Sequence, residues 1–217
     1  AIDLYGQERA NSKGIDLTDI DQVTQMRSNI ESWVNANEAQ VAQIKSDVEG
    51  LEAVTNPANL NEVLGYIQHA DETQMTAIVE RAHTAYADWS KTSVDERAIV
   101  LLKTADALEA HRDELIALCT KEAGKTIIDG VSEVREAVDF CRYYAARAHE
   151  LLADGTLEAR GVVLCISPWN FPLAIFLGQV SAAIVAGNTV VAKPAEQTSL
   201  VALRTIELMR ESGLPQS

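Results

Sequence analysis

Hydrophobic and polar positions repeat with a helical period through most of the first 150 residues. Apolar side chains that recur at spacings of three and four form one stripe of a helix, and the charged residues between them form its solvent face. Such stripes predict helices that begin near residues 20, 71, 93 and 131. We therefore expect this part of the chain to be a group of packed helices.

Two of these helices begin with the spacing of a capping box. Asp71 is followed three residues later by Gln74, and Ser93 by Glu96. In this arrangement each side chain bonds the backbone N–H of the other residue. The helix that starts after Ser93 is expected to run on to about 123–124, and the next one to span about 131–150.

A turn signal interrupts the helical pattern between residues 51 and 67. Asn56–Pro57 separates two short segments, and the second segment carries the apolar residues Val63, Leu64, Tyr66 and Ile67. Apolar runs on both sides of an Asn-Pro turn are typical of paired strands.

The pattern changes at Gly161, where a short unbroken apolar run occupies residues 162–166. Such a run is typical of a strand buried on both faces of a parallel sheet. Residues 173–186 are almost wholly apolar and small, which predicts a buried helix, and Gly187–Asn188 supplies its left-handed end.

A second strand is predicted at residues 189–192, followed by a last helix that Thr198 or Ser199 caps and that ends near Gly213. The order strand, helix, strand, helix favours parallel pairing with a right-handed crossover. The fold class predicted is therefore α/β: a helical N-terminal part followed by the first strands and helices of an incomplete Rossmann-like domain.

Composition narrows the classes of function. The chain has 217 residues, 47% of them hydrophobic, so it can bury a core and is not a disordered acidic tail. A net charge of −14 argues against nucleic-acid binding by this segment. Three cysteines without a framework spacing indicate a reducing compartment. We identify no signal peptide and no membrane-spanning segment, and the start at Ala1 suggests a piece of a longer protein.

Lys193 and Glu196 are the first candidates for chemistry. They lie at the mouth of the second predicted strand, where ligands bind in open α/β sheets. An ammonium and a carboxylate can donate to and accept from the two hydroxyls of a ribose, and a carboxylate there would repel a 2′-phosphate. If the pair binds a ribose, NAD is favoured over NADP; the alternative is a solvated Lys–Glu pair after a strand.

Asn170 is the second candidate, in the loop after the first predicted strand. Its side-chain amide can donate a hydrogen bond to the oxygen of a tetrahedral adduct formed from an aldehyde. The alternatives are a turn residue that satisfies its own backbone and, for the neighbouring Trp169, a side chain of the core.

These loops resemble a known family. The residues P-W-N-F-P at 168–172 and K-P-A-E at 193–196 are similar to the cofactor-binding segment of the aldehyde dehydrogenase superfamily. The resemblance implies that Asn170 is the catalytic oxyanion donor and that no metal takes part. It implies an NAD site formed by Ile166, Ser167, Pro168, Trp169, Lys193, Ala195 and Glu196. It also implies that Phe171, Ile175 and Gly178 line the aldehyde channel, with Gly178 leaving room.

The family's nucleophile is expected to lie outside this chain. Aldehyde dehydrogenases attack the substrate with a Cys thiolate and hydrolyse the thioester with a Glu-activated water, and those motifs follow the K-P-A-E segment. Cys119 and Cys141 fall on apolar helix faces, and Cys165 falls in the buried strand. All three are predicted to be buried thiols with a raised pKa.

Two further segments carry the resemblance toward the N-terminus. Asn56, Pro57, Glu62 and Gly65 approximately match the family's N-P-x-x-x-E-x-x-G strand pair, which packs on the dinucleotide domain. The E-A-G-K segment at 122–125 is similar to one that links helices in the family and binds no cofactor.

Residues 1–50 indicate a subfamily. The segment R-A-N-S at 9–12, followed by Gly14, Asp16 and Leu17, resembles the junction in bacterial proline utilization A proteins, where a flavin-dependent proline dehydrogenase domain leads into a glutamate-semialdehyde dehydrogenase domain. The predicted division is a helical linker at 1–50 and the N-terminal portion of the NAD-binding domain at 51–217. The alternative is a helical extension on another aldehyde dehydrogenase.

The implied function is oxidation of L-glutamate γ-semialdehyde, the open-chain form of 1-pyrroline-5-carboxylate, to glutamate by a longer parent enzyme. NAD is the cofactor of this domain, and FAD belongs to the parent's proline dehydrogenase domain. The fragment alone is expected to be inactive. Two alternatives remain open: a succinate semialdehyde or betaine aldehyde dehydrogenase, and a non-catalytic nucleotide-binding or assembly module.

The expected partners are the aldehyde, the remainder of the parent chain and further copies in a homo-oligomer. We expect a cytoplasmic location in a bacterium. The alternative is a parent protein that is attached peripherally to the inner membrane.

Overall fold

The computed structural model describes residues 20–44, 50–152 and 154–216, with side chains from 20 to 37 in the first of these ranges. The junction-like segment at 9–17 lies outside the described residues. The described elements are, in chain order, α2 (Ile20–Ile44), β1 (Glu52–Asn56), β2 (Asn59–Ile67), α3 (Glu72–Trp89), α4 (Val94–Ala110), α5 (Arg112–Ala123), α6 (Ile127–Leu152), β3 (Val162–Ile166), α7 (Ala174–Val185), β4 (Thr189–Lys193), the 3₁₀ turn η1 (Glu196–Thr198) and α8 (Ser199–Glu211). The mixed α/β fold class is confirmed.

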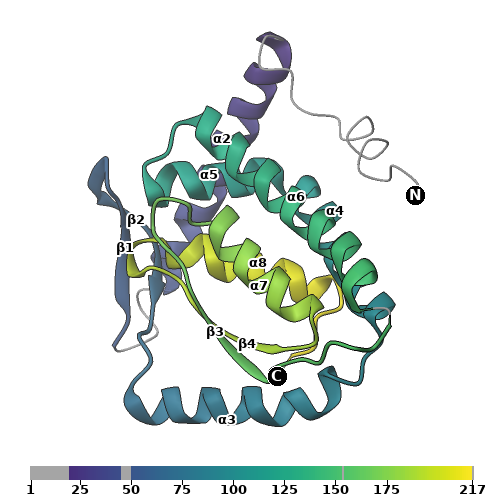
Figure 1. Ribbon diagram of the computed structural model, residues 1–217. Coiled ribbons are helices and arrows are strands. Elements are labelled where there is room, and N and C mark those ends of the chain that lie inside the picture. Colours follow the sequence, from purple (N-terminus) through teal and green to yellow (C-terminus); the bar gives the residue numbers. More distant parts are fainter. Residues whose placement is uncertain (1–19, 45–49, 153, 217) are drawn as a thin grey trace.

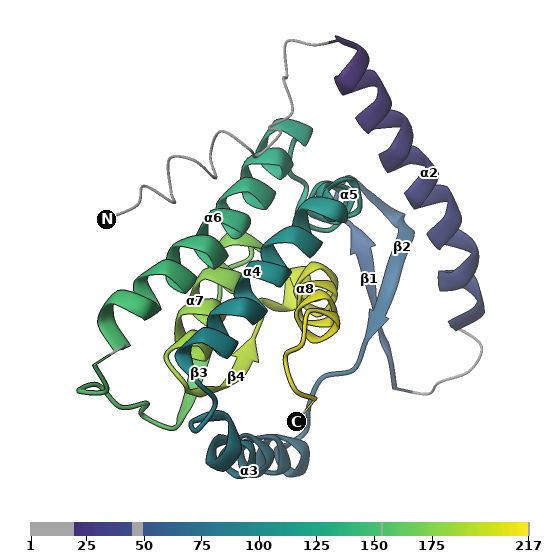
Figure 2. The same cartoon turned by 90° about the vertical axis from the view of Figure 1, so that its right-hand side faces the viewer.

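A core of packed helices occupies the centre of the molecule. The helices α4 and α6 lie side by side along one flank, and α7 and α8 pack beneath them (Figures 1 and 2). Leu101, Leu108, Leu115 and Leu177 are fully buried in this core. Their burial removes the apolar helix stripes from water, which is the main force that holds helices of this length together.

Both predicted capping boxes form. The Asp71 carboxylate accepts from Gln74 N at 2.8 Å, and the Ser93 hydroxyl accepts from Glu96 N at 3.2 Å. The reciprocal bonds to the cap residues' own N–H groups are present as well. Each box satisfies backbone groups that the first turn of a helix leaves without partners.

The predicted helix from 93 to about 124 is wrong as a single element. It breaks at His111, whose φ of −99° and ψ of 19° are not helical, and α5 begins at Arg112. The residues from Leu115 to Cys119 are buried consecutively, so α5 is enclosed around its whole circumference. After the break, α5 packs among α2, α6 and α8, which all contact it. The expected end at Gly124 is confirmed, with the left-handed φ of 66° that favours glycine.

The predicted strand pair is an antiparallel hairpin of β1 and β2. At its turn the Asn56 side chain accepts from Ala58 N at 2.9 Å, and its amide donates to Glu62 at 2.8 Å. A Cβ on Gly65 would lie 3.0 Å from the Leu200 side chain. The hairpin therefore packs closely on the start of α8, as expected for a strand pair that lies on the domain.

The strands β3 and β4 pair in parallel, as predicted, and α7 connects them. They lie between α7 and α3 (Figure 1), and Thr189 fastens β4 to α3 by donating its hydroxyl to Ala82 O at 2.8 Å. After α7, Gly187 takes a φ of 89° and Asn188 N donates to Ala183 O at 3.1 Å, which confirms the predicted helix end.

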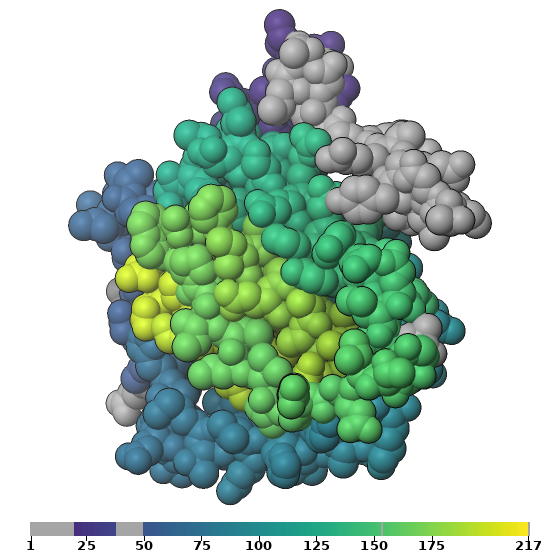
Figure 3. Space-filling view, in the orientation of Figure 1, coloured from purple at the N-terminus to yellow at the C-terminus, as the bar shows by residue number. Residues whose placement is uncertain are grey.

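Burial of β3 on both faces is a prediction that the structure corrects. Cys165 is 5% exposed, but Leu164 and Ile166 on the opposite face are each 60% exposed. No element among the described residues covers these two side chains. In the space-filling view the last third of the chain reaches the surface between α6 and α3 (Figure 3).

Among the helices of the described ranges, none combines the length and the apolar character needed to cross a membrane.

Candidate functional site

The carboxyl ends of β3 and β4 bring the two candidate loops together. Ile166 lies opposite Lys193 in the parallel register, and Ser167 N donates to Lys193 O at 3.2 Å. The loop that follows β3 therefore starts beside the loop that follows β4. This edge is where open α/β sheets bind ligands.

Lys193 and Glu196 face each other in the second loop. The Lys193 ammonium donates to Glu196 Oε1 at 2.7 Å, and both side chains are about half exposed. This bond lowers the pKa of the Glu196 carboxyl, and a hydrogen bond from its own backbone N–H adds to the effect. Because the pair is exposed, water weakens the attraction and either group can exchange its partner for a ligand hydroxyl.

The side chains of the first loop are directed toward solvent. Trp169 is 55% exposed, Phe171 is 40% exposed, and Asn170 is exposed as well. In the described part of the chain, neither the Asn170 amide nor the Trp169 indole has a hydrogen-bond partner. The amide is therefore free to donate to a ligand oxygen.

The three residues expected along the aldehyde channel have different surroundings. Phe171 is at the surface, Ile175 is half-buried, and Gly178 is fully buried. A Cβ on Gly178 would lie 3.0 Å from the Phe140 ring, so within this chain the space at Gly178 admits a side chain of α6. Of these three, only Phe171 shares the exposed surface of the loop.

Sequence reasoning missed how the two helices after the loops are held. The first residues of α7 and α8 receive no cap from their own side chains, so the prediction that Thr198 or Ser199 caps α8 is wrong. Ser199 instead donates its hydroxyl to Ala195 O. Buried glutamates of α5 and α6 accept the free N–H groups.

One glutamate comes from the E-A-G-K segment. The Glu122 carboxylate accepts from Leu200 N at 2.7 Å and from Val201 N at 2.9 Å. The segment does link α5 to α6, as predicted, but it also forms the cap of α8. A usable signal was present: Glu122 continues the buried stripe of Leu115, Leu118 and Cys119 at spacings of three and four, where a carboxylate needs donors.

Burial raises the pKa of the Glu122 carboxyl from its ordinary 4.5 to about 7, although the backbone N–H groups of Val201, Leu200 and Ser199 oppose the shift. The folded chain then holds a proton that the unfolded chain releases between these values. The free energy of unfolding should therefore fall as pH rises through this range, by on the order of 3 kcal/mol. Glu122→Gln should abolish that fall in urea unfolding measured between pH 4.5 and 8.

Glu196→Gln is the matched control for that experiment. The pKa of Glu196 is shifted downward, so its contribution to stability is lost as pH falls, which is the opposite direction. Its exposure makes the effect small. A Glu122→Gln chain that keeps the wild-type pH dependence would show that this carboxyl does not titrate in the range.

The three cysteines are buried, as predicted. Cys119 and Cys141 have no exposed surface and Cys165 very little. Burial raises the pKa of all three thiols, to about 12 for Cys141. A thiol in this state is a poor nucleophile. The described residues also contain no group of three His, Cys, Asp or Glu side chains placed to hold a metal ion.

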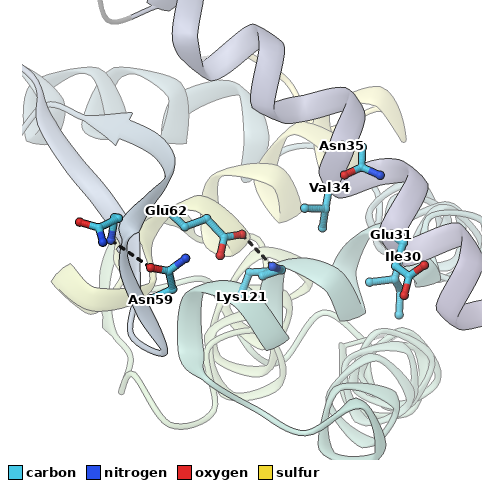
Figure 4. Close-up of a pocket in the computed structure, with 8 residues that line it drawn as sticks. Ile30, Glu31, Val34, Asn35, Asn59, Glu62 and Lys121 are labelled. Carbon is cyan, nitrogen blue, oxygen red and sulfur yellow. Dashed lines mark hydrogen bonds and ion pairs between the residues drawn. The ribbon is translucent and has the colours of Figure 1, made fainter.

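A separate hollow of about 600 Å³ lies between α2, β2 and α5 (Figure 4). Within this hollow, the Lys121 ammonium donates to Glu62 Oε1 at 2.7 Å, and this bond lowers the pKa of the Glu62 carboxyl. The lining residues are Ile30, Glu31, Val34, Asn35, Asn59, Asn61, Glu62 and Lys121. It includes none of the predicted site residues.

Comparison with known proteins places this geometry in context. Residues 44–217 match the model of the aldehyde dehydrogenase family. The bifunctional protein PutA of Salmonella typhimurium is 41% identical over 98% of this chain. The 1-pyrroline-5-carboxylate dehydrogenase of Anoxybacillus flavithermus is 38% identical over 74% of it.

Among solved structures, the 1-pyrroline-5-carboxylate dehydrogenase from Thermus with bound NAD covers 92% of this chain at 26% identity, with a TM-score of 0.80. The chain spans 16% of the length of the PutA relative, 33% of the Anoxybacillus enzyme and 42% of the Thermus enzyme.

Proposed function

The chain belongs to the aldehyde dehydrogenase family, and from this membership we propose that it is the leading part of an NAD-dependent enzyme that oxidises L-glutamate γ-semialdehyde to glutamate. The observation that carries the proposal is the pairing of β3 with β4, which starts the loop with the unpartnered Asn170 amide and the loop with the exposed Lys193–Glu196 pair at the same edge of the sheet. Relatives named PutA and 1-pyrroline-5-carboxylate dehydrogenase support the choice of aldehyde.

The carboxyl edge of the two strands suits a nucleotide. We assign the backbone and side chains of Ile166, Ser167, Pro168, Trp169, Lys193, Ala195 and Glu196 to the NAD site. Lys193 and Glu196 would bind the two ribose hydroxyls as donor and acceptor, and the exposed Trp169 indole would border the cofactor. When bound, NAD supplies the acceptor for the hydride that leaves the aldehyde carbon.

Asn170 would stabilise the charge that forms on the aldehyde oxygen. A fixed amide donor lowers the energy of an oxyanion more than that of a carbonyl, because its dipole already points to the site of developing charge. We assign Phe171, Ile175 and Gly178 to the substrate side of the same loop and helix. Gly178 packs against Phe140, where a Cβ would lie 3.0 Å from the ring, and so lets α7 approach α6 closely.

The wider assembly is part of the same proposal. Residues 1–50 would form a linker and residues 51–217 the start of the NAD-binding domain, with the catalytic cysteine and glutamate in the remainder of a longer chain. That chain would carry FAD in a proline dehydrogenase domain and form homo-oligomers. It would act in the bacterial cytoplasm, either free or attached peripherally to the inner membrane.

The cofactor assignment can be tested in the full-length protein with the double variant Lys193→Met and Glu196→Gln. Loss of two hydrogen bonds to the ribose should raise the KM for NAD about tenfold or more and change the KM for glutamate semialdehyde much less. Steady-state kinetics with each substrate varied in turn measures both constants.

The matched control is the double variant Lys121→Met and Glu62→Gln. This ion pair also has an N···O distance of 2.7 Å but lies in the separate hollow. It should leave the KM for NAD unchanged. Equal increases in both Michaelis constants for the Lys193 and Glu196 variant would contradict the assignment and indicate a general loss of structure.

A further inference from the structure

The loop that carries Asn170 is attached to a helix start with no cap of its own. The N-cap of α7 is Leu173, whose side chain cannot accept a hydrogen bond, and Leu173 and Ala174 are fully buried. Their N–H groups have no water to bond, so leaving them unpaired would be costly. The partner must come from another element.

Glu133 of α6 is that partner. Its carboxylate Oε2 accepts from Ala174 N at 2.9 Å and from Leu173 N at 3.2 Å. The Glu133 residue is only 2% exposed. A carboxylate at the N-terminus of a helix is also favoured by the helix dipole, and burial strengthens this interaction. One charged group therefore holds the start of α7 in place.

Lys125 completes the arrangement from the segment between α5 and α6. Its ammonium lies 2.6 Å from Glu133 Oε1, so it neutralises the buried charge on the oxygen that does not face the helix. The same ammonium lies 4.4 Å from the centroid of the Phe171 ring. Lys125 thus contacts the glutamate that caps α7 and the residue that follows Asn170.

The connection from this cap to Asn170 is short and stiff. Asn170 is three residues before Leu173, and Pro172 between them is buried and has a fixed φ. The proline also restricts Phe171 to extended conformations. A shift of the α7 start would therefore move the Asn170 amide by a similar amount.

We propose that Glu133, neutralised by Lys125, is a positioning residue that holds the Asn170 amide in place for the oxidation of the aldehyde. The inference rests on the proposed function. Neither residue needs to touch the substrate. Their effect would pass through the backbone at Leu173 and through the Phe171 ring.

The test uses the full-length protein with Glu133→Gln, Lys125→Met and the double variant that combines them. Glu133→Gln keeps an acceptor for α7 but loses the charge, so kcat with glutamate semialdehyde should fall about tenfold while the KM for NAD stays within about twofold. Lys125→Met leaves a buried carboxylate without its cation and should lower kcat further. The double variant removes that uncompensated charge and should recover kcat to the level of Glu133→Gln.

Glu122→Gln is the matched control, because Glu122 caps α8 in the same manner and from the same region. It should leave kcat within about twofold of the wild type. Equal losses of kcat in Glu122→Gln and Glu133→Gln, in proportion to losses in melting temperature, would overturn the proposal in favour of a general folding role. Wild-type kcat in Glu133→Gln would overturn it directly.

Amide hydrogen exchange in the same proteins separates this inference from the proposed function. Peptides that cover residues 168–176 should exchange faster in Glu133→Gln and Lys125→Met than in the wild type, and peptides from α8 should not. If the wild-type protein does not oxidise glutamate semialdehyde, succinate semialdehyde or betaine aldehyde, the proposed function fails. Faster exchange at residues 168–176 in the two variants would still support the role of Glu133 as the cap of α7. Unchanged exchange in both variants overturns the inference whatever the activity.

Discussion

Residues 1–217 alone are expected to reduce no NAD in the presence of glutamate semialdehyde, whereas the full-length protein should do so. The reason is the state of the three thiols. Cys119, Cys141 and Cys165 are buried and have a raised pKa, so at neutral pH almost none of each is thiolate. Covalent attack on an aldehyde needs that thiolate.

The measurement is the appearance of NADH absorbance in the presence of glutamate semialdehyde, recorded at high protein concentration. The triple variant Cys119→Ala, Cys141→Ala and Cys165→Ala in the full-length protein is the companion experiment. It should retain turnover because none of the three attacks substrate. NAD reduction by residues 1–217 alone would contradict the assignment of these thiols to the core. Loss of activity in a full-length triple variant that still folds would contradict it as well.

Asn170→Ala in the full-length protein should lower kcat by about 10²-fold or more, the scale observed when one oxyanion donor is removed. The side chain is exposed and makes no hydrogen bond among the described residues, so its loss should not weaken the fold. The effect should appear in kcat with glutamate semialdehyde as substrate, because the amide is needed most where negative charge develops on oxygen.

Two variants complete this experiment. Asn170→Asp has nearly the same shape but replaces the donor with a negative charge, so it should be at least as damaging as alanine. Asn61→Ala removes another exposed asparagine, in β2, and should leave kcat unchanged. If Asn170→Ala turns over at the wild-type rate, the amide is not the oxyanion donor.

Local signals predicted the elements well where partner residues are close in sequence. The capping boxes at Asp71 and Ser93 and the Asn56 turn depend on residues two or three positions apart, so the sequence contains the whole interaction. The parallel pairing of β3 and β4 also followed from local order, because a helix between two short strands leaves few other arrangements.

The errors arose where distant residues decide the conformation. No proline or glycine near His111 signals the break between α4 and α5 in the sequence. The break accompanies the packing of α5 among helices from other parts of the chain. Exposure of Leu164 and Ile166 depends on which elements lie over β3, and composition cannot show this. The cap of α8 comes from Glu122, 78 positions away from Leu200.

By itself the sequence determined the family, the strand and helix order, and the identities of Asn170, Lys193 and Glu196 as candidates, because these depend on short motifs and on periodicity. Only the tertiary structure decided that the loops bearing them meet at one edge and that Glu133 and Glu122 hold the helices behind them. The physical reason is that a buried helix start must find an acceptor, and packing across the chain determines which side chain is near enough to serve.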